Sequence, residues 1–207
     1  MSLNKIWAIS IFTMFSFFPL QAQWEVGGLT GFNVASISVN PGSSSEDYSS
    51  RMGFGIGLVA DRPLTEQLYL HAEPMFLQKG SKLETSNFTG KYKVNYIEIP
   101  VMFKYVFQNS ASFIPYAMAG PSFGLLTSAK LDIKDGGEQD EKDNTNSFDF
   151  GVGFGGGVTY PYENKTFFAE IRYVLGLTNI NKESDESTVK NRGLQVFVGV
   201  TFPVGSN

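Results

Sequence analysis

The fold is decided by residues 91–107, KYKVNYIEIPVMFKYVF, in which apolar and polar side chains alternate with a period of two. One face of this segment carries Ile97, Ile99, Val101, Phe103, Tyr105 and Phe107, and the other carries Tyr96, Glu98, Pro100, Met102 and Lys104. Successive residues of a β-strand point to opposite faces, so this pattern predicts a strand with two chemically different sides.

Seven further segments show a similar alternation, which is least regular in the first strand and in the strand after residue 111. Aromatic and β-branched residues favour strands, and the 22 glycines and 19 phenylalanines of the chain fit this class better than a helical one. The eight predicted strands span residues 24–39, 52–61, 67–79, 91–107, 112–131, 147–160, 166–180 and 194–202.

The connections between these segments alternate in length. Long polar connections span residues 40–51, 82–90, 132–146 and 181–191, and short ones span residues 62–66, 108–111 and 161–165. In outer-membrane barrels short turns face the periplasm and long loops face outward. The sequence therefore predicts an all-β, eight-stranded, antiparallel up-and-down transmembrane β-barrel, with both mature termini in the periplasm.

Alternation alone fits both a soluble barrel, with its apolar face inside, and a membrane barrel, with its apolar face toward lipid. The less apolar face makes a poor hydrophobic core, because it carries Gly53, Gly55, Gly57, Gly151, Gly153, Gly155, Gly157, Glu73, Glu98, Lys104, Asp149, Glu170 and Arg172. The apolar face ends in aromatic residues that suit membrane interfaces, namely Tyr105, Phe107, Tyr160, Phe167 and Phe202. A membrane barrel is favoured, and a secreted lipocalin-like binding barrel is the alternative.

The first 22 residues have the features of an export signal. Lys5 precedes a mostly apolar run at residues 6–20, and Gln21-Ala22-Gln23 follows, which predicts cleavage after Ala22. The run is short for a membrane helix, which needs about 20 residues, so an uncleaved anchor is the lesser alternative. Residues 1–22 are therefore expected to be a signal peptide and residues 23–207 an outer-membrane barrel domain. No later stretch is apolar enough for a membrane helix, and a closed barrel is the remaining way to span a membrane.

Composition excludes several functional classes. The net charge of −4 and a pI near 5.1 argue against nucleic-acid binding, which requires a basic surface. The absence of cysteine excludes disulfides, thiolate metal sites and a lipidated N-terminal cysteine. His71 is the sole histidine, and the sequence has no G-x-S-x-G motif, so we expect no enzyme activity, catalytic residue, cofactor or metal. His71 is expected to be an interior hydrogen-bonding residue.

Five charged residues on the presumed interior face are the candidate site. An eight-stranded barrel has an interior just wide enough for side chains, and opposite charges there should pair because an unpaired buried charge is costly. We expect a salt-bridge network that plugs the barrel, and a narrow channel or small-ligand transporter is the alternative. The candidate residues are Glu73, Glu98, Lys104, Glu170 and Arg172.

Two other patterns call for interpretation. Residues 132–149 contain seven acidic side chains, which could bind calcium, but their spacing does not match an EF-hand and a solvated outer loop is the simpler interpretation. The glycine-rich run at residues 151–156 lies within a period-two strand and not between a strand and a helix, so it does not predict a nucleotide-binding loop.

Several short motifs, taken in order, resemble the small outer-membrane β-barrel proteins of the Bacteroidetes known as the PorT family. These are Gln21-Ala22-Gln23, Ala72-Glu73-Pro74 with Gln78-Lys79-Gly80, Tyr96-Ile97-Glu98-Ile99-Pro100-Val101, Pro115-Tyr116 with Ala119-Gly120-Pro121, and Glu170-Ile171-Arg172-Tyr173 followed by Gly176-Leu177-Thr178-Asn179-Ile180. The resemblance implies a barrel in the outer membrane and no single activity.

Three partners are expected for such a protein. The first is outer-membrane lipid. The second is the barrel-assembly machinery, which reads an aromatic terminal strand such as residues 196–202. The third is an unidentified protein or surface that meets the outer loops.

Overall fold

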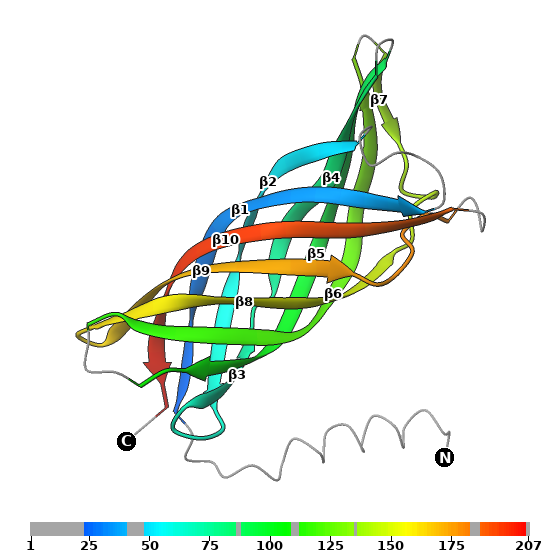
Figure 1. Cartoon of the computed structure of the whole chain (residues 1–207). Helices are drawn as coiled ribbons and strands as arrows, with labels where there is room; N and C mark the ends of the chain where they lie inside the picture. Colours follow the sequence, from blue (N-terminus) through cyan, green and yellow to red (C-terminus); the bar gives the residue numbers. More distant parts are fainter. Residues whose placement is uncertain are drawn as a thin grey trace, which may run out of the picture.

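A computed structural model describes residues 23–40, 48–85, 88–108, 112–134, 136–182 and 187–205. The predicted export signal, residues 1–22, lies outside the described residues. Within those ranges no helix is long and apolar enough to cross a membrane. The chain instead forms one curved antiparallel sheet, in which β1 begins and β10 ends at the same end of the molecule (Figure 1).

The sheet contains ten strands, and their pairings return to the strand from which they start. β5 pairs with β4, the order continues through β2, β1, β10, β9, β8 and β6, and β6 pairs again with β5. The strands are β1 (Trp24–Asn40), β2 (Tyr48–Pro63), β3 (Leu68–Ala72), β4 (Met75–Thr85), β5 (Phe88–Val106), β6 (Ile114–Ile133), β7 (Gly137–Asp140), β8 (Phe148–Tyr162), β9 (Lys165–Gly176) and β10 (Thr188–Val204).

The count of ten differs from the predicted eight for two reasons. The predicted strand at residues 67–79 is divided into β3 and β4 at Glu73 and Pro74, because proline has no N–H to give to a ladder. Both halves lie between β2 and β5, so they continue one line of the sheet. The other addition is β7, which pairs with β6 inside the segment that was expected to be a loop.

The strands also extend further at the long-loop end than the sequence predicted. β2 begins at Tyr48, β5 begins at Phe88 and β10 begins at Thr188, so much of the predicted loops at residues 40–51, 82–90 and 181–191 is strand. β9 is the exception, because it ends at Gly176 and not at residue 180. There the backbone N–H of Leu177 donates to the Phe150 carbonyl at 2.7 Å outside the regular ladder.

The two faces of β5 exchange their chemical character along the strand. Between Ile97 and Tyr105 the apolar side chains point outward, with Phe103 57% exposed, and the charged side chains of Glu98 and Lys104 are buried. Before Ile97 the parity is unchanged but Lys91 and Lys93 take outward positions, while Val94 and Tyr96 are buried. Such an exchange is expected where a strand passes from lipid into water, because the favourable outward residue changes from apolar to polar.

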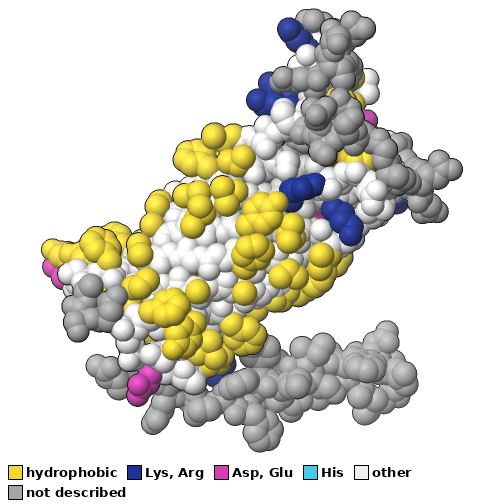
Figure 2. Space-filling view, in the orientation of Figure 1, with side chains coloured by type: hydrophobic (Ala, Val, Ile, Leu, Met, Phe, Trp, Pro, Cys, Tyr) yellow, Lys and Arg dark blue, Asp and Glu magenta, His cyan; other side chains and the backbone are white. Residues whose placement is uncertain are grey.

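Exposed hydrophobic side chains gather over the wall of the sheet. Figure 2 shows hydrophobic side chains over the wall that β1, β2, β8, β9 and β10 form, with Lys and Arg side chains nearer the outer end of this wall. The aromatic residues that the sequence assigned to an interface are all exposed, at the end that carries the short turns: Tyr105, Phe107, Tyr160, Phe167 and Phe202.

A pair of substitutions on one face of β1 tests where this band ends. Phe32 is 60% exposed within the band, and Ser38 has the same parity beyond it. A lysine at position 32 should lower the free energy of unfolding in lipid vesicles by about 2–4 kcal/mol, whereas Ser38→Lys should change it by about 0–1 kcal/mol. Denaturant titrations of the vesicle-embedded protein measure both values, and equal losses would contradict the assigned boundary.

Candidate functional site in the interior

Six charged side chains meet inside the sheet toward the short-turn end, and we name them the lower cluster. Each is at most 6% exposed. They come from β2, β3, the β3–β4 connection, β5 and β9, so segments far apart in the sequence contribute to one group. The members are Asp61, His71, Glu73, Lys104, Glu170 and Arg172.

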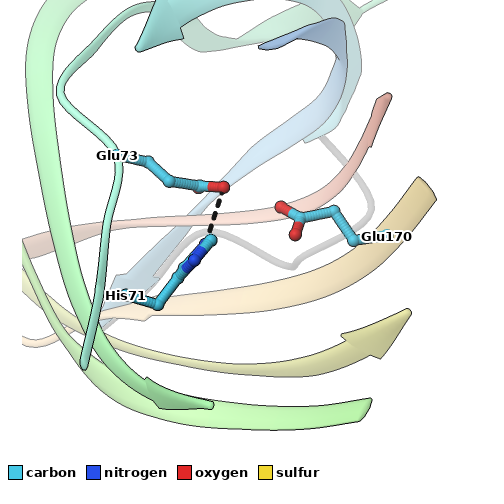
Figure 3. A group of neighbouring side chains, drawn as sticks. All are labelled: His71, Glu73 and Glu170. Carbon is cyan, nitrogen blue, oxygen red and sulfur yellow. Dashed lines mark hydrogen bonds and ion pairs between the residues drawn. The ribbon is translucent and has the colours of Figure 1, made fainter. Parts of the chain in front are cut away.

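His71 is held between two carboxylates. Its Nδ1 lies 2.6 Å from Asp61 Oδ1, and its Nε2 lies 2.8 Å from Glu73 Oε1. An ionised carboxylate only accepts hydrogen bonds, so both contacts are satisfied together when both ring nitrogens carry a proton. Figure 3 shows this His71–Glu73 bond, with the Glu170 carboxylate facing the pair from β9.

Arg172 connects the carboxylates of the lower cluster. Its Nη1 pairs with Glu73 and lies 3.4 Å from Glu170 Oε1, and its Nε donates to Gln195 Oε1 at 2.6 Å. The guanidinium also lies 4.9 Å from the ring centroid of Phe197, where a cation is attracted to the aromatic face. Arginine suits this position because its planar group can reach several partners at once and stays charged.

Lys104 completes the lower cluster, and Tyr116 contacts two of its members. Lys104 Nζ donates to Asp61 Oδ2 at 2.9 Å and lies 4.5 Å from the centroid of the Tyr116 ring. The Tyr116 hydroxyl donates to Glu170 Oε2 at 2.9 Å. With His71 protonated on both nitrogens, the three carboxylates are matched by three cations. The cluster is then neutral, which limits the electrostatic cost of burying it.

A second group, the upper cluster, lies nearer the long-loop end. Lys79 on β4 forms ion pairs with Glu98 on β5 and with Asp149 on β8, the latter at 3.2 Å. All three side chains are buried, and Asn191 Nδ2 also donates to Asp149 Oδ2 at 2.8 Å. One lysine therefore links strands on opposite sides of the interior.

Glycine on the interior face makes room for these large side chains. A Cβ at Gly55 would lie 2.7 Å from Cε1 of Phe197, and a Cβ at Gly153 would lie 2.7 Å from Cε of Met102. Such distances are shorter than van der Waals contact. The alternating glycines thus allow Phe197, and the Arg172 guanidinium packed on it, to fill the interior.

The model of one protein family matches residues 20–182, which is most of the chain. Its description is outer membrane protein beta-barrel domain. The chain belongs to this family. Membership agrees with the outward apolar band and the buried charges, and it confirms the sequence-based prediction of an outer-membrane barrel protein. A search of curated proteins finds no relative with significant similarity.

Solved structures of other outer-membrane proteins have the same fold as this family member. Neisserial surface protein A is 20% identical, with 87% of this chain and 97% of that chain covered and a TM-score of 0.55. OprG from Pseudomonas aeruginosa is 11% identical, covering 89% and 97%, with a TM-score of 0.56. A major outer membrane protein from Thermus thermophilus is 11% identical, covering 89% and 100%, with a TM-score of 0.54. At these identities the likeness concerns the fold alone.

All five candidate residues of this outer-membrane barrel lie in its interior, but in two groups. Glu73, Lys104, Glu170 and Arg172 are in the lower cluster, and Glu98 is in the upper one. Sequence reasoning did not include several of their partners among the candidates: Asp61, Lys79, Tyr116, Asp149 and Gln195. Lys79 and Asp149 share the interior parity of the five, so parity could have identified them. Asp61 is the last residue of the predicted strand 52–61, where parity says little about the direction of a side chain.

The lower cluster also contains a grouping with the composition of a metal site. Ligand atoms of His71, Glu73 and Glu170 all lie within 4.8 Å of one another, whereas the sequence led us to expect no metal. Both nitrogens of His71 already contact carboxylates, and the Arg172 guanidinium lies against both glutamates. A cation of the chain itself thus occupies the position that a metal ion would take.

The acidic segment 132–149 is not the single solvated loop that was expected. Its β7 pairs with β6, and Lys93 Nζ lies 2.8 Å from both Asp132 and Glu138. Lys130 Nζ donates to the second oxygen of Glu138 at 2.9 Å. Asp149 belongs to the upper cluster, and Asp135 lies outside the described residues. Lysines therefore hold carboxylates that were considered as calcium ligands.

Arg172 provides the sharpest test of the lower cluster. Arg172→Gln leaves Glu73 and Glu170 buried without their main counter-charge, so the free energy of unfolding should fall by about 3–5 kcal/mol. The double variant Arg172→Met with Glu73→Met keeps cations and carboxylates equal in number and should lose markedly less. Urea unfolding followed by tryptophan fluorescence measures both. If the double variant is less stable than Arg172→Gln, charge pairing is not what holds the cluster.

Proposed function

We propose that this protein is a non-conducting outer-membrane barrel that serves a structural or interaction role through its outer segments. In this proposal eight strands cross the membrane, with β3 and β4 acting as one. The observation that carries it is the filled interior, where two ion-paired clusters lie one above the other between the two ends of the barrel.

The packing between the clusters supports a closed interior. Tyr96, Met102, Phe197 and Gln195 are at most 1% exposed, so they add uncharged bulk around the charged groups. An ion that crosses would have to break ion pairs such as Lys79–Glu98 in a region of low dielectric constant, where the separated charges are costly. This cost disfavours the alternative role as a narrow channel or small-ligand transporter.

The outer segments offer the surface on which such a role depends. β6 and β7 reach furthest from the end that holds the start of β1 and the end of β10 (Figure 1). Exposed loops on a rigid scaffold are common sites of recognition. We propose that partners, whether proteins or surfaces, meet this end, and that the barrel has no enzymatic role.

The outward apolar face does not suit a secreted lipocalin-like barrel, which would place its apolar side chains inside.

We also propose that the protein is related to the PorT proteins of the Bacteroidetes, and ordered motifs such as Tyr96-Ile97-Glu98-Ile99-Pro100-Val101 support this relationship. The signal peptide at residues 1–22 and insertion by the barrel-assembly machinery belong to the same proposal.

Conductance separates a plugged barrel from a channel. The wild-type protein in a planar lipid bilayer should show no resolvable single-channel current, and Glu98→Gln should show none either, because the lower cluster still closes the interior. A steady wild-type current that changes in Glu98→Gln would contradict the proposal and support an ion path. Unboiled samples that migrate differently from boiled samples in a gel would show that both proteins are folded.

The β6–β7 pair at the outer end should respond to acid only at low pH. Hydrogen bonds from Lys93 and then Lys130 lower the pKa of Glu138 from 4.5 to about 2. A carboxyl group whose pKa is lower in the folded protein than in the unfolded chain stabilises the folded form at pH values above the unfolded-state pKa. This stabilisation is lost as pH falls from about 4.5 to about 2. The protection factors of the β7 amides, which are corrected for the intrinsic pH dependence of exchange, should therefore be steady between pH 7 and 5 and decrease as pH falls from about 4.5 to about 2.

Glu138→Gln is the control for this effect. It removes the titrating group, so the step in β7 exchange between pH 4.5 and 2 should disappear while the strand pairing with β6 remains. A step of the same size in Glu138→Gln would show that other carboxylates cause the change.

A further inference from the structure

Basic side chains gather on the outward face just beyond the lipid-facing band. On β5, Lys91 and Lys93 continue the parity of Ile97 and Ile99. On β10, Lys190 and Arg192 continue the parity of Leu194, which is 39% exposed. Figure 2 shows Lys and Arg side chains at this place, next to the hydrophobic ones.

Strand register places these residues in two groups, one on β10 and β1 and one on β2, β4 and β5, and the β1–β2 ladder between the groups ends at Ala35 and Arg51. Arg192 and Lys190 lie opposite Ser36 and Ser38 of β1. Further around the sheet, Lys82 of β4 lies opposite both Ser49 of β2 and Lys91 of β5. The result is an arc of ammonium, guanidinium and hydroxyl groups over five strands. We name it the basic arc: Ser36, Ser38, Ser49, Lys82, Lys91, Lys190 and Arg192.

The cations of the basic arc differ from the neighbouring lysines in their pairing among the described residues. Lys93 and Lys130, at its β6 edge, are paired with Asp132 and Glu138. In the part of the chain that the structure describes, by contrast, no ion pair is formed by Lys82, Lys91, Lys190 or Arg192. Lys82 and Lys91 even face each other across β4 and β5, an arrangement that costs free energy unless an anion lies between them.

The arc covers one sector of the barrel and not its whole circumference. Arg192 lies opposite Leu175 of β9, which is 42% exposed, and Leu177 follows at 49%. Phe148, at the outer end of β8, is 47% exposed. β8 and β9 thus remain apolar to their outer ends, so the positive charge of the arc lies on β10, β4 and β5, and the serine hydroxyls lie on β1 and β2.

A surface depression marks one end of the arc. It has a volume of about 230 Å³ and is lined by Thr89, Lys91, Asp132 and Lys134. Lys93 pairs with Asp132 at 2.8 Å, and among the described residues Lys91 and Lys134 form no ion pair beside the Thr89 hydroxyl. Ammonium and hydroxyl donors around a shallow space of this kind suit a phosphate group.

We infer that the basic arc binds the phosphate groups of glycolipid in the outer leaflet, so that lipid headgroups are held against β10, β1, β2, β4 and β5. The arc begins where the lipid-facing side chains end, so the groups that meet it are the headgroups of the lipids whose chains contact Val34 and Leu194. Clusters of basic residues next to a membrane-embedded surface recognise anionic headgroups in this way.

Lipid retention in native mass spectrometry tests the inference on the full-length mature protein. The probes are a bis-phosphorylated lipid A and the same lipid without its phosphates, added to detergent-folded protein. We expect the wild type to retain the phosphorylated lipid preferentially. The variant Lys91→Gln with Lys190→Gln and Arg192→Gln should retain it about a hundredfold less, because each basic residue near the headgroups contributes about fivefold.

The matched control removes the same charge elsewhere, through Lys142→Gln, Lys165→Gln and Lys182→Gln, and should retain the lipid as the wild type does. Equal retention of both lipids by the wild type would overturn the inference. So would an equal loss in the control, which would show an effect of net charge. Stronger binding of a soluble sulfated polysaccharide than of the phosphorylated lipid would overturn it in favour of an external ligand. Gel mobility before and after boiling confirms that each variant is folded.

Discussion

The constraint on which this structure depends is the pairing of backbone hydrogen bonds in a medium without water. Every N–H and C=O within hydrocarbon needs a partner inside the protein, so a sheet that spans the membrane must have no open edge. The pairing of β5 with β6 meets this requirement, because it joins the two strands that would otherwise form edges. β3 and β4 share one place between β2 and β5, so the break at Pro74 leaves no gap in the ring.

Closure with so few strands determines what the interior can contain. The interior of such a barrel is only wide enough for side chains, so the side chains that point inward from opposite walls must pack against each other. The glycines at positions 55 and 153 admit Phe197 and Met102, and the ion pairs of Arg172 and Lys79 cross the remaining space. The interior side chains thereby support the wall from within.

The exchange of faces along the strands connects the fold to the membrane that surrounds it. Outward residues are apolar at Phe103 and basic at Lys91 on the same strand, since the solvent changes from lipid to water between them. The same exchange explains why the strands continue into segments that were predicted as loops. A polar outward face and an apolar inward face, as at Val94 and Tyr96, make a strand that is stable in water. The basic arc lies at the boundary between the two regimes.

The sequence by itself determined the strand class, the outward apolar face and the interior location of Glu73, Glu98, Lys104, Glu170 and Arg172, whereas strands extend into the connections that it predicted as long loops. It could do so because parity along a strand is a local property with a period of two. The tertiary structure alone decided which charges pair, since Asp61 reaches Lys104 and Lys79 reaches Asp149 only after strands distant in sequence close the sheet. It also decided the division into two clusters and the adjacency of Arg192 to Ser36, because register between strands depends on the packing of the whole wall.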